Sequence, residues 1–87
     1  MPEFLLLLSP NEQQDARLGL AFSKKFIAKA SSRNRIKRIF RESFRQQQLP
    51  AVDIVALSRK GLGQTDNDEL FARLVKAWQK VNSFYAG

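Results

Sequence analysis

The chain contains no cysteine and no histidine among its 87 residues. Without cysteine it has no disulfide, no thiolate zinc site and no thiol nucleophile. Without histidine it lacks the commonest acid–base side chain near neutral pH and the commonest ligand of transition metals. Catalysis by a serine–histidine or cysteine–histidine pair is excluded for the same reason. These two absences remove much of enzyme chemistry before any motif is considered.

Long apolar runs are also missing. The run Phe4–Leu8 has five residues, whereas a membrane-spanning helix needs about 20. A signal peptide would begin with positive charge and carry a longer apolar core, but here Glu3 precedes the run and Ser9-Pro10 ends it. The sequence therefore predicts a cytoplasmic protein that does not enter a membrane.

Acidic residues are few, and the basic residues are concentrated in one segment. The chain has 15 lysines and arginines against eight aspartates and glutamates. Nine of the basic residues and a single acid, Glu42, lie between Lys24 and Arg45, so this segment carries +8 and the rest of the chain −1. Such asymmetry indicates a polyanionic partner, of which nucleic acid is the commonest.

Composition and length predict one small globular domain over residues 1–87. Hydrophobic residues make up 44% of the chain and charged residues 26%, a proportion typical of a folded protein. There is no internal repeat, low-complexity tract or linker that would divide the chain. A second hydrophobic core would not fit in this length.

Two strands are expected in the first quarter of the chain. Phe4–Leu8 is a short apolar strand that the turn-forming residues 9–11 end. Arg17–Ser23 alternates between apolar and other side chains, with Leu18, Leu20 and Phe22 on one face. The polar link Asn11–Asp15 is short enough to join the two strands as a hairpin.

A helix follows, from Arg33 to about Gln48. Ser31-Ser32 offers an N-cap, and Leu49-Pro50 ends the helix, because a proline disfavours helical conformation at the residue before it. At 100° per residue the apolar side chains form one stripe that faces the core. That stripe consists of Ile36, Ile39, Phe40, Ser43 and Phe44.

The last third of the chain predicts a strand and a second helix. Asp53–Ser58 is apolar and β-branched, and residues 59–61 end it. Thr65 or Asp66 can cap the helix, with Asp68 or Glu69 as the capping-box partner. Its apolar positions are Leu70, Phe71, Leu74, Val75, Trp78 and Val81. The order strand-strand-helix-strand-helix predicts an α+β fold with both helices on one face of a small sheet.

The first helix also carries a basic arc beside its apolar stripe. The arc consists of Arg33, Asn34, Lys37, Arg38, Arg41 and Arg45. Like charges four residues apart repel by a few tenths of a kcal/mol, so this arc costs helix stability unless an anion lies against it. Arginine suits bidentate phosphate contacts. The alternative interpretation is a solvated helix face. Glu42 lies outside the arc, where an ion pair with Arg35 or Arg38 is expected.

Arg33–Glu42, with the sequence R-N-R-I-K-R-I-F-R-E, resembles the RNR signature of the bacterial ribonuclease P protein component. The resemblance continues backward through Arg17–Lys25 and forward through Leu49–Gly61, and it covers the chain from Phe4 to about Val81. It implies an α+β fold like that of the second domain of ribosomal protein S5. It also implies a function: the family binds a catalytic RNA, and the two together remove the 5′ leader from precursor tRNA.

The resemblance further implies that the RNA subunit performs the hydrolysis with Mg²⁺, so that the protein has no catalytic residue and no metal site of its own. The family's RNR helix docks on the catalytic RNA, and its cleft along the sheet binds the single-stranded leader. The residues matching the docking helix are Arg33, Asn34, Arg35, Lys37, Arg38, Arg41 and Arg45. Those matching the leader cleft are Lys24, Lys25, Arg59 and Lys60, for which solubilising charges at strand ends are the alternative interpretation.

The chain departs from the family pattern before Phe4, where family members usually carry a further helix that contributes aromatic residues to the leader cleft. Some members also have an aromatic residue at the position of Leu7. We therefore expect an N-terminally truncated member of the family. The missing helix would leave apolar surface on the sheet, which predicts a homodimer.

Other candidate sites and functions are weaker. Asp53 has no carboxylate partner nearby, which favours a hydrogen-bonding role over a metal ligand. Gly61-Leu62-Gly63 is too short for a phosphate loop, and Trp78 belongs to the apolar stripe of the last helix. The rival functions are a non-catalytic RNA-binding module, a basic helix that lies on a membrane surface or binds a partner, and a stand-alone protein nuclease, which the residue types disfavour.

Overall fold

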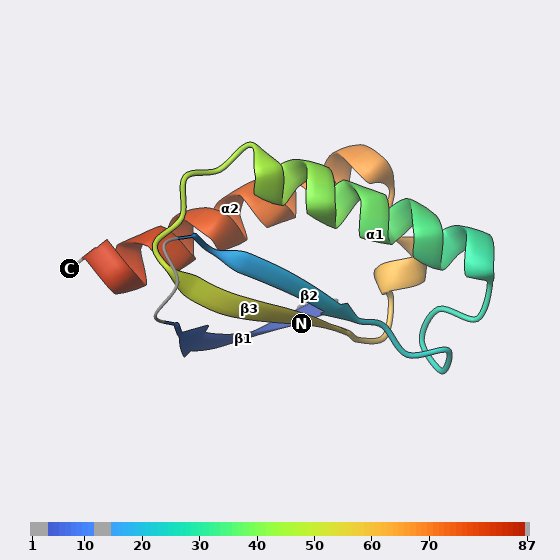
Figure 1. Ribbon diagram of the computed structural model, residues 1–87. Helices are drawn as coiled ribbons and strands as arrows, with labels where there is room; N and C mark the ends of the chain where they lie inside the picture. The colour runs from blue at the N-terminus through green and yellow to red at the C-terminus, as the bar shows by residue number, and fades with distance from the viewer. Residues whose placement is uncertain (1–3, 12–14, 87) are drawn as a thin grey trace.

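The computed structural model describes residues 4–11 and 15–86, which form a three-stranded sheet and two helices. Along the chain the elements are β1 (Phe4–Pro10), β2 (Arg17–Ala21), α1 (Ala30–Arg45), β3 (Val52–Ser58), the short 3₁₀ turn η1 (Leu62–Gln64) and α2 (Asn67–Ala86). Figure 1 shows both helices over the same face of the sheet. The predicted α+β class and element order are confirmed.

The strand order is β1-β3-β2, so the predicted hairpin between the first two strands is wrong. β3 lies between them, antiparallel to β1 and parallel to β2. The physical reason lies in burial: Val52, Ile54 and Ala56 of β3 are at most 1% exposed. The strand with the most buried inner face takes the centre of the sheet, and β1 and β2 become its edges.

The strand boundaries differ slightly from the predicted ones. β1 continues past Leu8 to Pro10, which pairs with Val52. A proline is tolerated there because β1 is an edge strand, where a missing N–H group breaks no ladder on the outer side. β2 ends at Ala21 rather than Ser23, and β3 begins one residue before Asp53.

α1 begins and ends about three residues earlier than predicted. Its N-cap is Lys29, which makes no side-chain capping hydrogen bond, so Ser31-Ser32 is not the cap. At the other end the backbone N–H of Gln47 donates to the carbonyl of Phe44 at 3.1 Å. This tightened last turn closes the helix at Arg45 before Leu49-Pro50 is reached.

α2 begins as one of the two predicted alternatives. The Asp66 carboxylate accepts a hydrogen bond of 2.8 Å from the backbone N–H of Glu69, which is the N-cap geometry. The Thr65 hydroxyl instead donates to the carbonyl of Gly61 at 3.0 Å. Gly61 has a φ of 97°, a conformation that glycine adopts without steric cost. The Glu69 side chain pairs with Arg73 rather than with the cap.

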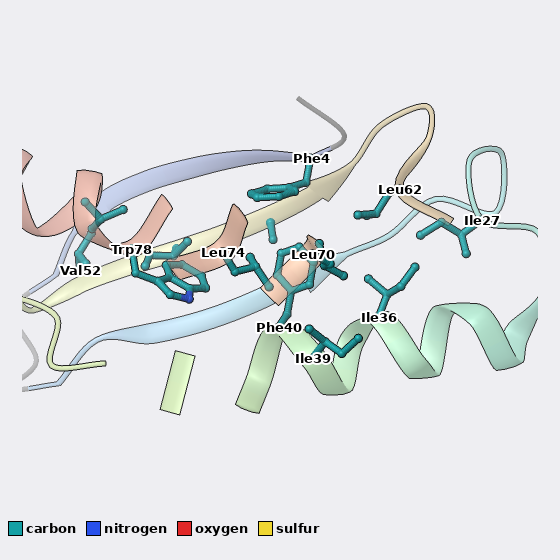
Figure 2. Packing of buried hydrophobic residues seen from close by; sticks show 13 residues of the cluster. Phe4, Ile27, Ile36, Ile39, Phe40, Val52, Leu62, Leu70, Leu74 and Trp78 are labelled. Carbon is teal, nitrogen blue, oxygen red and sulfur yellow. The ribbon is translucent and has the colours of Figure 1, made fainter. Parts of the chain in front are cut away.

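The core lies between the helices and the sheet (Figure 2), and it contains the predicted stripes of both helices except for Val75, which is half-buried outside it. Phe40 of α1 packs edge-on against Phe4 of β1, with ring centroids 5.3 Å apart. Trp78 of α2 is fully buried, as predicted, and its indole N–H donates to the Ser43 hydroxyl of α1 at 2.8 Å. This buried hydrogen bond joins the two helices directly beneath the basic arc.

Candidate nucleic-acid interface

Most of the basic arc lies on the outer side of α1. Ile36, Phe40 and Ser43 face the core and are fully buried, and the opposite side of the helix carries the arc. Four of its members are exposed and Lys37 is half-buried; the exposed four are Asn34, Arg38, Arg41 and Arg45. Within residues 4–11 and 15–86 none of these five side chains forms a hydrogen bond or ion pair. The four basic side chains among them present positive charge to solvent.

Arg33 differs from the other members of the arc, because its guanidinium folds back on the chain before α1. It donates to the carbonyl of Ile27 at 2.7 Å and to that of Ala28 at 3.0 Å. These bonds fix the direction in which the chain enters the helix. Arg33 therefore holds the beginning of α1.

Arg35, also matched to the docking helix, reaches the segment before α2. Its guanidinium donates to the Asn67 side chain, and it lies 3.5 Å from the carbonyl of Thr65 and 3.4 Å from that of Gly63. These contacts join α1 to η1 and to the start of α2. The ion pair expected for Glu42 does not form with any residue in the described ranges, because Arg35 points to this segment and Arg38 to solvent.

The four residues matched to the leader cleft come together at one end of the sheet. β2 and β3 are parallel, so the chain leaves both strands at the same end, and the backbone N–H of Ser23 donates to the Ser58 hydroxyl there at 2.7 Å. The side chains that follow are all exposed: Lys24, Lys25, Arg59 and Lys60. Lys25 is additionally placed over the ring of Phe26, 5.7 Å from its centroid.

The sheet face opposite the helices carries an apolar surface, as the sequence predicts, and the structure shows which residues form it. Leu5 and Leu7 of β1 and Val55 of β3 are 38%, 50% and 37% exposed on it. The register places Leu7 beside Val55 and Val55 beside Gly19. The signal was present in the sequence, because β1 is apolar at every position from Phe4 to Leu8 and a strand buried on one face alone would alternate.

A polar row ends this open face. Asp53 accepts hydrogen bonds from the Arg17 guanidinium at 2.8 and 2.9 Å and from the Asn11 amide at 2.8 Å. The hydrogen bonds from Arg17 and Asn11 lower the pKa of Asp53 to about 2. The prediction of a hydrogen-bonding aspartate is confirmed, and Asp53 fastens β2 to β3.

Two features are absent from the described part of the chain. None of its helices is long and apolar enough to span a membrane. Nor do residues 4–11 and 15–86 contain three or more carboxylate, cysteine or histidine side chains grouped so that they could hold a metal ion.

Comparison with known proteins gives a consistent result. The family model described as Ribonuclease P matches residues 1–82. The ribonuclease P protein component of Legionella pneumophila (strain Lens) is 53% identical over 83 residues, which are 95% of this chain and 73% of that protein. The ribonuclease P protein component of Pseudoalteromonas atlantica is 49% identical over 82 residues, covering 92% and 68% of the two chains.

Solved structures agree in fold. The RNase P protein of Thermotoga maritima, in complex with 1-(4-fluorophenyl)-2-thiourea, superposes with a TM-score of 0.80 at 30% identity, covering 90% of this chain and 78% of the other. The RNase P protein of Staphylococcus aureus gives a TM-score of 0.72 at 27% identity, covering 93% and 72%.

Proposed function

The chain belongs to the family of the ribonuclease P protein component, and from this membership we propose how its surfaces divide the work of that enzyme. Ribonuclease P is the endoribonuclease that removes the 5′ leader from precursor tRNA, and the chain acts as its protein subunit. We propose that α1 docks on the catalytic RNA subunit and that one end of the sheet binds the leader.

The observation that supports docking by α1 is a row of exposed cations that have no partner among the described residues. Arg38, Arg41 and Arg45 follow one another along the outer side of the helix, and no carboxylate in residues 4–11 and 15–86 forms an ion pair with them. Repulsion among them is relieved when phosphates lie against the helix and condensed counterions are released. With Asn34 and Lys37 beside them, these residues form the docking surface in this proposal.

Arg33 and Arg35 have a different role in the proposal. Their guanidinium groups donate to carbonyl and amide oxygens of the chain itself. They position α1 relative to the segments before and after it, so that the outward side chains meet the RNA in one fixed arrangement. Binding to the RNA is thereby preorganised.

The leader is proposed to cross the open face of the sheet. Lys24, Lys25, Arg59 and Lys60 lie together at one end of that face, where they would contact the phosphates of a single strand. The apolar patch of Leu5, Leu7 and Val55 would lie under its bases. Since the patch is aliphatic, contact with the bases is less strong than stacking on aromatic rings.

Mg²⁺ is proposed to be held by phosphates of the RNA subunit. Supporting this, the described residues offer no group of three carboxylates that could hold a metal ion, and Asp53 is already hydrogen-bonded to Arg17 and Asn11. In this proposal the protein contributes positive charge that lowers the Mg²⁺ concentration the RNA needs, and it acts in the cytoplasm with precursor tRNA as substrate.

The test is cleavage of precursor tRNA by the RNA subunit at low Mg²⁺, with and without the protein. The protein should restore cleavage at the 5′ junction, and the protein alone should cut nothing. Arg38→Ala should weaken binding to the RNA subunit and lower the slope of log affinity against log salt by nearly one. Lys76→Ala removes the same charge from the exposed side of α2 and should leave the slope unchanged. Equal slopes for Arg38→Ala and the unmodified protein would contradict docking by α1.

A further inference from the structure

A groove of about 870 Å³ lies between the beginning of β2 and the C-terminal end of α1. Its walls are residues 15–18 on the strand side, and Arg41, Phe44, Arg45 and residues 47–49 on the helix side. In Figure 1 the segment after α1 descends past the start of β2 at this end of the molecule. The volume is within the range of about 300–1,000 Å³ that small-molecule sites occupy.

The lining combines three kinds of chemistry. Arg41 and Arg45 supply positive charge, and they have no internal partner among the described residues. Leu18, Leu49 and the half-buried ring of Phe44 supply apolar surface. The side-chain amides of Gln47 and Gln48 can both donate and accept hydrogen bonds. A nucleotide consists of the matching parts: a phosphate, a flat apolar face and an edge of donors and acceptors.

The groove is held in shape by contacts within the chain. The Phe44 ring packs edge-on against the buried Trp78, with centroids 5.6 Å apart. The Gln48 carbonyl accepts a hydrogen bond of 3.1 Å from the Asn82 amide of α2, and the backbone N–H of Gln47 is bonded to Phe44. The walls are therefore fixed before any ligand enters, which reduces the entropy lost on binding.

We propose that this groove binds one unpaired nucleotide of the catalytic RNA subunit. The proposal rests on docking by α1, because Arg41 and Arg45 belong to both the basic arc and the groove. The phosphate would lie at these arginines, the base against Phe44 and Leu18, and the base edge at Gln47 or Gln48. A helical stretch of RNA would contact the convex outer side of α1 through its phosphates, but only a nucleotide outside a helix can insert its base into a groove.

The RNA subunit is the source of the nucleotide because the groove continues the proposed docking surface. The residues matched to the leader cleft lie at the other end of the sheet, where β2 and β3 end, whereas the groove lies where β2 begins. Asp15 is the one carboxylate among the described residues of the lining. Its charge would keep the phosphate on the helix side.

Binding of the RNA subunit, transcribed in vitro, separates this proposal from the proposed function. The double variant Gln47→Ala/Gln48→Ala removes the amides proposed to contact the base edge, so it should weaken binding of the RNA subunit about ten-fold. Because it removes no charge, the salt slope should stay unchanged. Arg38→Ala, outside the groove, should lower the slope. If Arg38→Ala lowers the slope and the double variant binds like the unmodified protein, the groove does not bind a nucleotide, whereas docking by α1 is supported. If neither variant affects binding, both the nucleotide site and docking by α1 are contradicted.

Site-specific cross-linking identifies the nucleotide. Because the chain has no cysteine, Gln47→Cys can carry a single photoreactive group, with Glu42→Cys, at an exposed position of α1 outside the groove, as the matched control. We expect the group at position 47 to cross-link to one unpaired nucleotide of the RNA subunit. The group at position 42 should not cross-link to that nucleotide. Cross-links from position 47 to base-paired nucleotides only, to precursor tRNA only, or to no RNA would overturn the proposal. Thermal unfolding of each variant verifies that it is folded.

Discussion

Replacing Arg33 separates the residues that hold α1 from those that contact RNA. Arg33 lies within the signature Arg33–Glu42 and on the basic arc, so the sequence assigns it to the RNA interface. In the structure its guanidinium instead donates to two carbonyls, of Ile27 at 2.7 Å and of Ala28 at 3.0 Å. Arg33→Ala should therefore reduce the stability of the fold more than it reduces the charge available to RNA.

The size of the effect follows from these two bonds. Hydrogen bonds to a charged group contribute about 1.5–3 kcal/mol when they are buried, but the bond to Ala28 is exposed and water replaces it in the variant. We expect a loss of about 1–2 kcal/mol in the free energy of unfolding. For a domain of this size that corresponds to a decrease of roughly 5–15 °C in Tm.

The assay is thermal unfolding by circular dichroism together with a salt titration of RNA binding below the Tm of the variant. Arg38→Ala is the matched control, because it removes the same guanidinium from an exposed site without an internal partner in the described residues. Arg33→Ala should lower the Tm and leave the salt slope unchanged. Arg38→Ala should leave the Tm unchanged and lower the salt slope. Arg33→Lys, which keeps the charge but not the planar guanidinium whose Nη1 donates to both carbonyls, should recover only part of the Tm. An unchanged Tm with a lower salt slope for Arg33→Ala would refute the reasoning.

Three further predictions concern the core, the polar row and the open face. Ser43→Ala leaves the buried indole N–H of Trp78 without its acceptor, so it should lower the free energy of unfolding by about 1–3 kcal/mol in urea titrations, and an unchanged midpoint would contradict this. Since the folded-state pKa of Asp53 is lowered to about 2, its contribution should be complete above about pH 4 and be lost as the pH falls toward 2. Asp53→Asn should therefore unfold at a lower temperature than the unmodified protein at pH 6, and the difference should shrink at pH 2; a difference independent of pH would exclude this linkage. The exposed leucines Leu5 and Leu7 predict a homodimer through the open face, which sedimentation at high micromolar concentration should detect and Leu7→Glu should abolish; a 10 kDa species alone would disprove it.

The sequence by itself determined the features that depend on local periodicity. The stripe through Ile36 and Phe40 predicted which side of α1 is buried, and by subtraction which side presents the arginines. The apolar, β-branched run Asp53–Ser58 likewise predicted a strand, and Asp66 was one of the two predicted caps of α2, because each signal depends on neighbours within a few positions. The resemblance carried by Arg33–Glu42 identified the family, which the comparisons confirmed.

Only the tertiary structure decided what depends on residues far apart in the chain. β3 lies between β1 and β2 because the three strands compete for the buried centre of the sheet. No local sequence pattern predicts which strand takes that position. The same holds for Arg33 and Arg35. Both are residue types that commonly contact RNA, but in the folded chain they donate to the Ile27 carbonyl and to the Asn67 side chain. The groove beside Phe44 arises because β2 and the end of α1 meet there, although about 25 residues separate them in the sequence. The sequence determines which groups can donate or accept, but only the folded chain determines which of them lie within hydrogen-bonding distance.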